Sequence, residues 1–157
     1  MQYHTHLAFG AVAGIAAVKF MNIDISDGML IYGGGVLLGS LLPDIDHPRS
    51  KISNKVPILP SVINLIFSHR SFFHSIVFVA LLSLLYSAPI PGSFVTGLII
   101  GVISHMIGDM MTNKGIKLLF PFGSYISLPL TFRTGGIVEQ ILFFLFTIGA
   151  YGLLMVF

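Results

Sequence analysis

The sequence predicts an all-α protein, a polytopic membrane helix bundle with about five membrane-embedded helices and one interfacial helix. Two observations predict this class. Of the 157 residues, 55% are hydrophobic and 9% are charged, and the mean hydropathy is +0.94, values typical of integral membrane proteins. The apolar residues also come in runs of helix length separated by short polar segments. No repeat or linker divides the chain, so we expect one membrane-embedded domain over residues 1–157.

The first part of the chain holds two apolar runs. Residues 7–18 are rich in Ala and Gly, and Thr5 is a candidate N-cap, so we expect a helix of short span length that ends at Lys19. Two histidines and no positive charge precede this run, so we expect no cleaved signal peptide. Residues 21–28 form a polar loop, and residues 29–42 are a second apolar run that is short for an isolated span.

The rest of the chain alternates between apolar runs and polar connectors. Residues 48–68 combine basic side chains with an apolar stretch and prolines, which favours a helix lying on the membrane surface. Residues 72–90, 94–111 and 137–157 are predicted to span the membrane. Residues 112–136 are too polar and too rich in Gly and Pro to span, and a connector of this length indicates an interfacial lid or substrate loop.

The distribution of charge predicts the topology. Threading the runs alternately across a bilayer places the N-terminus, residues 43–71 and residues 112–136 on one side, and Phe157 on the other. Seven of the eight basic residues then share the first side, which the positive-inside rule makes cytoplasmic. All six histidines and four of the six acidic residues lie on that same side.

Composition also limits the function. The formal net charge of +2 is too small to indicate nucleic-acid binding, which requires a cluster of cations. The chain has no cysteine, so a bound metal must use histidine and carboxylate ligands. Mixed nitrogen and oxygen ligation suits a divalent transition metal, Zn or else Mn or Fe, better than Mg or Ca.

The segment LLPDIDHPRS at residues 41–50 gathers polar side chains at the end of an apolar run. Asp44 and Asp46 precede His47, and Pro43 and Pro48 disfavour helix in the residues before them, so we expect a stiff turn at the membrane edge. Such a turn presents metal ligands. An Asx-type turn that only caps a helix end is the alternative.

His105 and Asp109 are four residues apart in a predicted span, so they project from one helix face and could bind the same ion. A hydrogen-bonded pair between helices is the alternative. Ionisable residues inside a span cost about 2.5–3.5 kcal/mol even on insertion scales, which favours a functional reason for both.

Further polar residues flank the predicted spans. His69 and His74 stand at the entry of one span, and Arg70 between them suits a clamp for phosphate or, alternatively, a topology anchor. Glu139 begins the last span, where a favourable interaction with the helix dipole is the simpler explanation. His6 lies near the N-terminus, where an interfacial side chain is the alternative to a metal ligand.

These motifs resemble, in order and spacing, the LexA-regulated inner-membrane metal-dependent hydrolase family of YdjM-like proteins. The matching segments are His6, LLPDIDHPRS at 41–50, HRSFFHS at 69–75, SHMIGDMMTNKG at 104–115, LLFPF at 118–122 and GG-x-x-E at 135–139. The resemblance covers nearly the whole chain and implies a metal-dependent hydrolase linked to the DNA-damage response. That family is similar in turn to the all-α zinc phospholipases C and related nucleases, in which an H-x-x-x-D helix serves a multi-metal phosphoesterase centre.

The resemblance implies a set of metal ligands, with Glu139 as a further candidate. The set is His6, Asp44, Asp46, His69, His74, His105 and Asp109. Two features depart from the pattern. Phe73 stands where the family commonly has Thr, and nothing in the sequence indicates the processed N-terminal amine that ligates metal in the phospholipases.

The combined expectation is a phosphoesterase acting on a lipid or lipid-linked phosphate at the cytoplasmic face of the bacterial inner membrane. Metal lowers the pKa of a bound water, Asp46 or Glu139 acts as base, and Arg70 or Arg133 stabilises the developing phosphoryl charge. The alternatives are a non-catalytic membrane protein with a structural metal and a small ion- or proton-coupled transporter. A transporter would need polar residues at the midplane and a repeat, and the sequence has neither.

Overall fold

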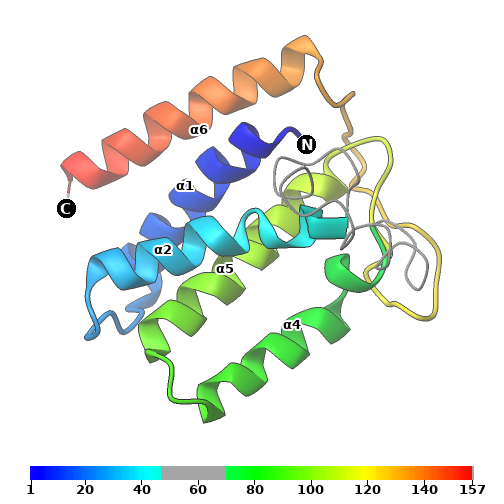
Figure 1. Cartoon of the computed structure of the whole chain (residues 1–157). Coiled ribbons are helices and arrows are strands. Elements are labelled where there is room, and N and C mark those ends of the chain that lie inside the picture. The colour runs from blue at the N-terminus through cyan, green and yellow to red at the C-terminus, as the bar shows by residue number, and fades with distance from the viewer. Residues whose placement is uncertain (47–69, 157) are drawn as a thin grey trace.

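The structure is a computed structural model that describes residues 1–46 and 70–156. The described residues form α-helices and short 3-10 helices and contain no β-strand, which confirms the predicted all-α class (Figure 1). The elements are α1 (Tyr3–Met21), α2 (Met29–Gly39), η1 (Leu42–Asp46), η3 (Phe72–His74), α4 (Ile76–Ser83), η4 (Leu84–Ser87), α5 (Gly92–Met110) and α6 (Ile137–Met155).

The predicted number of about five membrane-embedded helices is not supported. Within the described ranges, only α5 and α6 are long and apolar enough to cross a membrane. The 11 residues of α2 extend about 16 Å, roughly half of a hydrocarbon core about 30 Å thick. The predicted interfacial helix, residues 48–68, lies outside the described residues.

Two predicted helix starts need correction. Residues 72–90 do not form one helix, because Ser75 is extended and its hydroxyl accepts a hydrogen bond from the Phe78 N–H, which starts α4 afresh after η3. Thr5 is not an N-cap, because α1 already begins at Tyr3 and Gln2 takes the capping position without a side-chain hydrogen bond. Thr5 is instead buried in the first turn of α1.

Helix α5 is the centre of the bundle and contacts α1, α2 and α4, while α6 packs against α1 (Figure 1). The backbones of α2 and α5 touch. A Cβ added at Gly35 or Gly39 of α2 would overlap backbone atoms of α5, and one at Gly97 or Gly101 of α5 would overlap backbone atoms of α2. Small residues allow this close approach of helices. The contact fixes the C-terminal end of α2 against α5.

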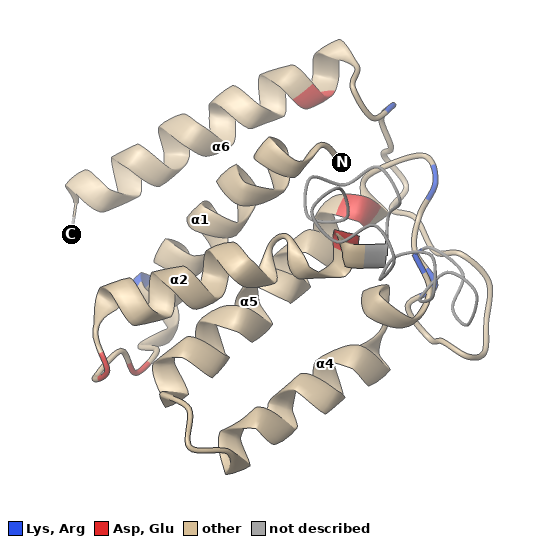
Figure 2. Ribbon diagram, in the orientation of Figure 1, with Lys and Arg blue, Asp and Glu red and all other residues tan. Residues whose placement is uncertain are grey.

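The charged residues of the described chain separate to two ends of the bundle (Figure 2). At one end, which we call the site end, α1 and α6 begin and α2 and α5 finish, as the alternate threading predicts. The opposite end holds the loop before α2. There the Ser93 backbone N–H donates to Asp27 at 2.9 Å and the Asp27 N–H donates to Ser93 Oγ at 3.3 Å, and hydrogen bonding to Ser93 lowers the pKa of Asp27.

Candidate metal centre

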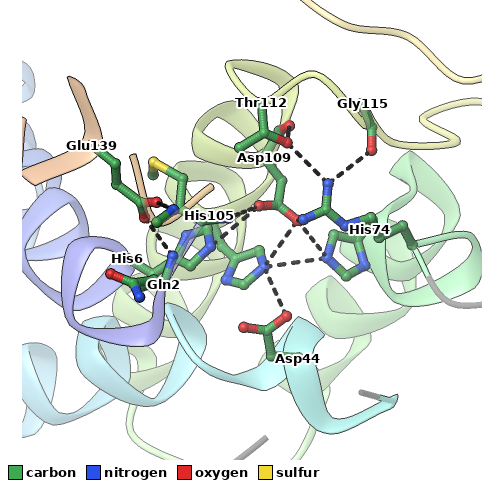
Figure 3. Close-up of polar contacts among 12 residues, drawn as sticks. Gln2, His6, Asp44, His74, His105, Asp109, Thr112, Gly115 and Glu139 are labelled. Carbon is green, nitrogen blue, oxygen red and sulfur yellow. Dashed lines mark hydrogen bonds and ion pairs between the residues drawn. The ribbon is translucent and has the colours of Figure 1, made fainter. Parts of the chain in front are cut away.

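Asp109, in the last turn of α5, is the centre of the polar cluster at the site end (Figure 3). Its side chain is fully buried, and three imidazoles surround it. His6 Nε2 lies 3.3 Å from Oδ1, and the Nε2 atoms of His74 and His105 lie 3.5 and 3.9 Å from Oδ2. A buried carboxylate is costly unless it is paired or coordinates a metal. The surrounding groups therefore offset the free-energy cost of burying the Asp109 carboxylate.

His105 is oriented by the end of α2. Its Nδ1 lies 2.8 Å from the carbonyl oxygen of Ser40, the C-cap residue, where helix carbonyls lack partners within the helix. A carbonyl can only accept, so Nδ1 carries the proton and Nε2 keeps a free lone pair. That Nε2 atom lies 3.2 Å from His74 Nε2 and 3.8 Å from Asp44 Oδ1. A backbone acceptor on one ring nitrogen is typical of metal-binding histidines.

His6 reaches the cluster from α1 by lying flat on His105. The two ring centroids are 3.7 Å apart with 8° between the ring planes. A Cβ added at Gly108 would overlap Met1 Cε, whereas His6 Nδ1 would lie 3.4 Å from it, at ordinary contact distance. Two positive imidazolium rings would repel at a centroid distance of 3.7 Å, so the stacking of His6 on His105 favours neutral rings with lone pairs available for a metal.

Two groups of candidate metal ligands share His105. One group is His6, Asp44 and His105, and the other is His74, His105 and Asp109. Within each group, one ligand atom from each residue lies within 4.8 Å of the other two. Ligand bonds of about 2.0–2.2 Å to Zn place the ligand atoms of a tetrahedral site roughly 3.4 Å apart. The separations of 3.2–3.9 Å among His74, His105 and Asp109 and between His105 and Asp44 therefore fit a metal held by nitrogen and oxygen.

Two cationic groups also contact Asp109. The amino group of Met1 forms an ion pair with Oδ1, and Arg70 Nη2 lies 3.1 Å from Oδ2. The other end of the Arg70 fork, Nη1, donates to Thr112 Oγ1 at 3.0 Å and to the Gly115 carbonyl at 3.3 Å. Arg70 thus joins Asp109 to the segment that follows α5.

Glu139 lies beside the cluster but belongs to neither ligand group. Its carboxylate is buried and accepts two backbone hydrogen bonds, from Gln2 at 2.5 Å and from Gly135 at 2.6 Å. Gly135 has φ +79°, a conformation that favours glycine. These bonds join the start of α1 to the start of α6. The role of Glu139 as general base stays a prediction.

We expect Glu139→Gln to destabilise the protein by about 1–3 kcal/mol while leaving its metal content unchanged. An amide has a single acceptor oxygen, so one of the two backbone N–H donors loses its partner. Thermal unfolding and metal analysis of the purified protein measure the two effects, with Gln140→Ala, an exposed neighbour, as the control. Lost turnover at full metal occupancy and unchanged stability would instead assign Glu139 the role of base.

The structure brings together five of the seven predicted ligands, namely His6, Asp44, His74, His105 and Asp109. His69 lies outside the described residues, as does the side chain of Asp46. Of the two predicted phosphate clamps, Arg70 contacts the cluster and Arg133 is exposed.

Three groups at the site were not identified from the sequence. They are the amino group of Met1, the Ser40 carbonyl and the Thr112 hydroxyl. Of these groups, only Thr112 could have been proposed as a site residue from the sequence, because it follows Asp109 by three residues at the end of the predicted helix.

The fold and this cluster define an all-α protein with two helices of membrane-span length and a candidate His/Asp metal site at one end of its bundle. The family model described as YdjM inner membrane protein matches residues 1–156, so the chain belongs to the YdjM inner membrane protein family. This confirms the resemblance to YdjM-like proteins seen in the motifs, whereas regulation by LexA, hydrolase activity and similarity to the zinc phospholipases C stay predictions.

Curated relatives agree with this assignment. The chain is 40% identical over 138 residues to the uncharacterized protein YvsG of Bacillus subtilis (strain 168). The aligned residues make up 87% of this chain and 84% of YvsG. It is 38% identical over 100 residues to the inner membrane protein YdjM of Escherichia coli (strain K12). The aligned residues make up 60% of this chain and 51% of that protein. The chain thus spans about half the length of YdjM. No solved structure matches.

Proposed function

We propose that this chain is a membrane-bound, metal-dependent phosphoesterase that acts on a lipid or lipid-linked phosphate. The observation that carries the proposal is the buried cluster of three histidines and an aspartate, with Asp44 beside it, at the end of a bundle of apolar helices. Oxygen and nitrogen donors without sulfur favour Zn, with Mn or Fe as alternatives. A metal in such a site polarises a phosphoryl oxygen and lowers the pKa of bound water.

The residues of the cluster have distinct roles in this proposal. Ser40 holds His105 with its Nε2 lone pair directed into the site, which keeps the ligand in place before metal binds. The side chain of Asp44 is 21% exposed while those of His105 and Asp109 are 0% exposed, so substrate enters from the side of η1. Arg70 presents a guanidinium next to Asp109, where phosphoryl charge would develop.

A lipid substrate follows from the location of the cluster. The site lies where α5 ends and α6 begins, and these helices have span length, so a head group at the membrane surface lies level with it. No acidic or basic side chain lies in the middle of α5 or α6, which disfavours a proton-coupled transporter. A purely structural metal would not require the partly open position of Asp44.

The deciding experiment is a substrate panel on purified protein in nanodiscs, with and without Zn, Mn or Fe. Phospholipids, phosphatidic acid and prenyl phosphates are the substrates, and release of phosphate or head group is the readout. We expect metal-dependent hydrolysis that falls on the order of 10²-fold or more in His105→Ala. Metal that raises the Tm of the wild-type protein without turnover of any substrate in the panel would favour the structural-metal alternative.

We also propose that the site end faces the cytoplasm of a bacterial inner membrane. The described part of this end carries Arg70, Lys114, Lys117 and Arg133, as the positive-inside rule requires.

We therefore expect a cysteine at Ser26, in the loop at the opposite end, to react with an impermeant thiol reagent in intact cells. A cysteine at Thr134 should react only after permeabilisation. The chain has no native cysteine to interfere, and both positions are exposed. The reverse pattern of labelling would invert the topology.

A further inference from the structure

The connector between α5 and α6 is folded onto the site end by backbone hydrogen bonds. Ile116 and Ile126 each donate to the other, at 3.0 and 2.8 Å, which closes residues 117–125 into a loop. Leu128 donates to the Met110 carbonyl at 2.8 Å, and Phe132 donates to the Met111 carbonyl at 3.0 Å. The connector is therefore fixed to the last turn of α5 and does not hang freely from it.

This fixed connector exposes large apolar side chains. Phe122 is 79% exposed and Leu130 is 88% exposed, and Leu119, Tyr125 and Leu128 are exposed as well. Scattered exposed apolar residues are normal on a soluble surface, but several of them on one short segment indicate a binding surface. We call residues 119–130 the apolar loop.

The flanks of the apolar loop indicate what covers it. The connector leaves α5 at Met110 and enters α6 at Ile137, so both of its ends lie at the same end of the two span-length helices. Lys114, Lys117 and Arg133 flank the loop in sequence and are exposed or partly exposed (Figure 2). Apolar and aromatic side chains between cations match the boundary between acyl chains and anionic head groups.

We propose that the apolar loop inserts into the membrane surface at the level of anionic lipid head groups, with these cations contacting the lipid phosphates. The base of the connector is bonded to the candidate metal centre, because the Lys117 backbone N–H donates to the Arg70 carbonyl at 3.0 Å and the Arg70 side chain contacts Asp109. Lipid bound by the apolar loop is therefore held beside the site. The insertion itself does not depend on the proposed phosphoesterase activity.

Spin labels in the full-length, cysteine-free chain test the insertion. Single cysteines replace Phe122 or Leu130, and the protein is reconstituted in nanodiscs containing anionic lipid. Collision with oxygen, which concentrates in acyl chains, is compared with collision with a water-soluble nickel chelate. Labels at Ile148, on the exposed face of α6, and at Ser26, in the polar loop before α2, are the lipid and water references.

We expect the labels in the loop and the reference label at Ile148 to collide with oxygen several-fold more than with nickel. Nickel collisions equal to those at Ser26 would overturn the proposal. Protection from both reagents would also overturn it, because the loop would then be covered by protein, such as a second copy of the chain.

Charge reversal tests the part of the proposal that concerns anionic lipid. In Lys114→Glu/Lys117→Glu with a label at Leu130, the ratio of oxygen to nickel collisions should fall several-fold in anionic nanodiscs and change little in zwitterionic ones. Lys19→Glu is the matched control, because Lys19 lies in the last turn of α1, at the opposite end of the bundle. An unchanged ratio in anionic lipid would overturn the proposed contact between these cations and lipid phosphates. Circular dichroism verifies that each variant is folded.

Discussion

The His105→Ala variant is expected to purify without most of the metal that the wild-type protein binds. His105 belongs to both groups of candidate ligands, so its removal weakens every arrangement of the site that the described residues offer. Losing even an outer partner of a metal ligand costs about 10–100-fold in affinity, and the ligand itself should cost more. Elemental analysis of protein grown in metal-replete medium measures the effect.

His4→Ala is the matched control for this prediction. His4 lies on α1 two residues before His6, but its ring packs edge-on against Phe143 of α6 at a centroid distance of 4.9 Å. The control variant should keep its metal. A wild-type protein without metal, or equal loss in both variants, would contradict the proposed site. Asp109→Asn is less clean, because it leaves Arg70 without a buried carboxylate and this alone costs about 3–5 kcal/mol.

The Gly39→Leu variant is expected to lose about 3 kcal/mol or more of stability, together with its metal. A side chain at this position meets the backbone of α5 at Leu98, so α2 must move away from α5. The movement carries the Ser40 carbonyl away from His105 and shifts Asp44, which follows α2 directly. Thermal unfolding in detergent and metal analysis measure the two losses.

Gly34→Leu is the matched control on the same helix. Gly34 is exposed, and nothing lies within 4 Å of a Cβ placed there, so leucine meets open space and improves helix propensity. We expect this variant to fold and to bind metal like the wild-type protein. Equal effects of the two substitutions would mean that α2 and α5 are not in backbone contact.

The sequence by itself determined the all-α class of the protein and most of the candidate ligands for a metal site. Mean hydropathy and the absence of cysteine predicted an all-α membrane protein whose metal ligands are histidine and carboxylate. The spacing of His105 and Asp109 placed both on one face of α5, and alternate threading placed His6, Asp44 and His74 at the same end. These properties follow from local composition and helical periodicity, which a single sequence contains.

Only the tertiary structure decided which of these side chains touch and what holds them. Hydropathy sets the depth of a residue in a membrane but not the rotation of its helix, so the stacking of His6 on His105 could not be predicted. The Ser40 carbonyl has no signal in the sequence, because every residue carries the same backbone acceptor and only packing selects one. The division of residues 72–90 likewise depends on where packed helices end, which apolar composition does not record.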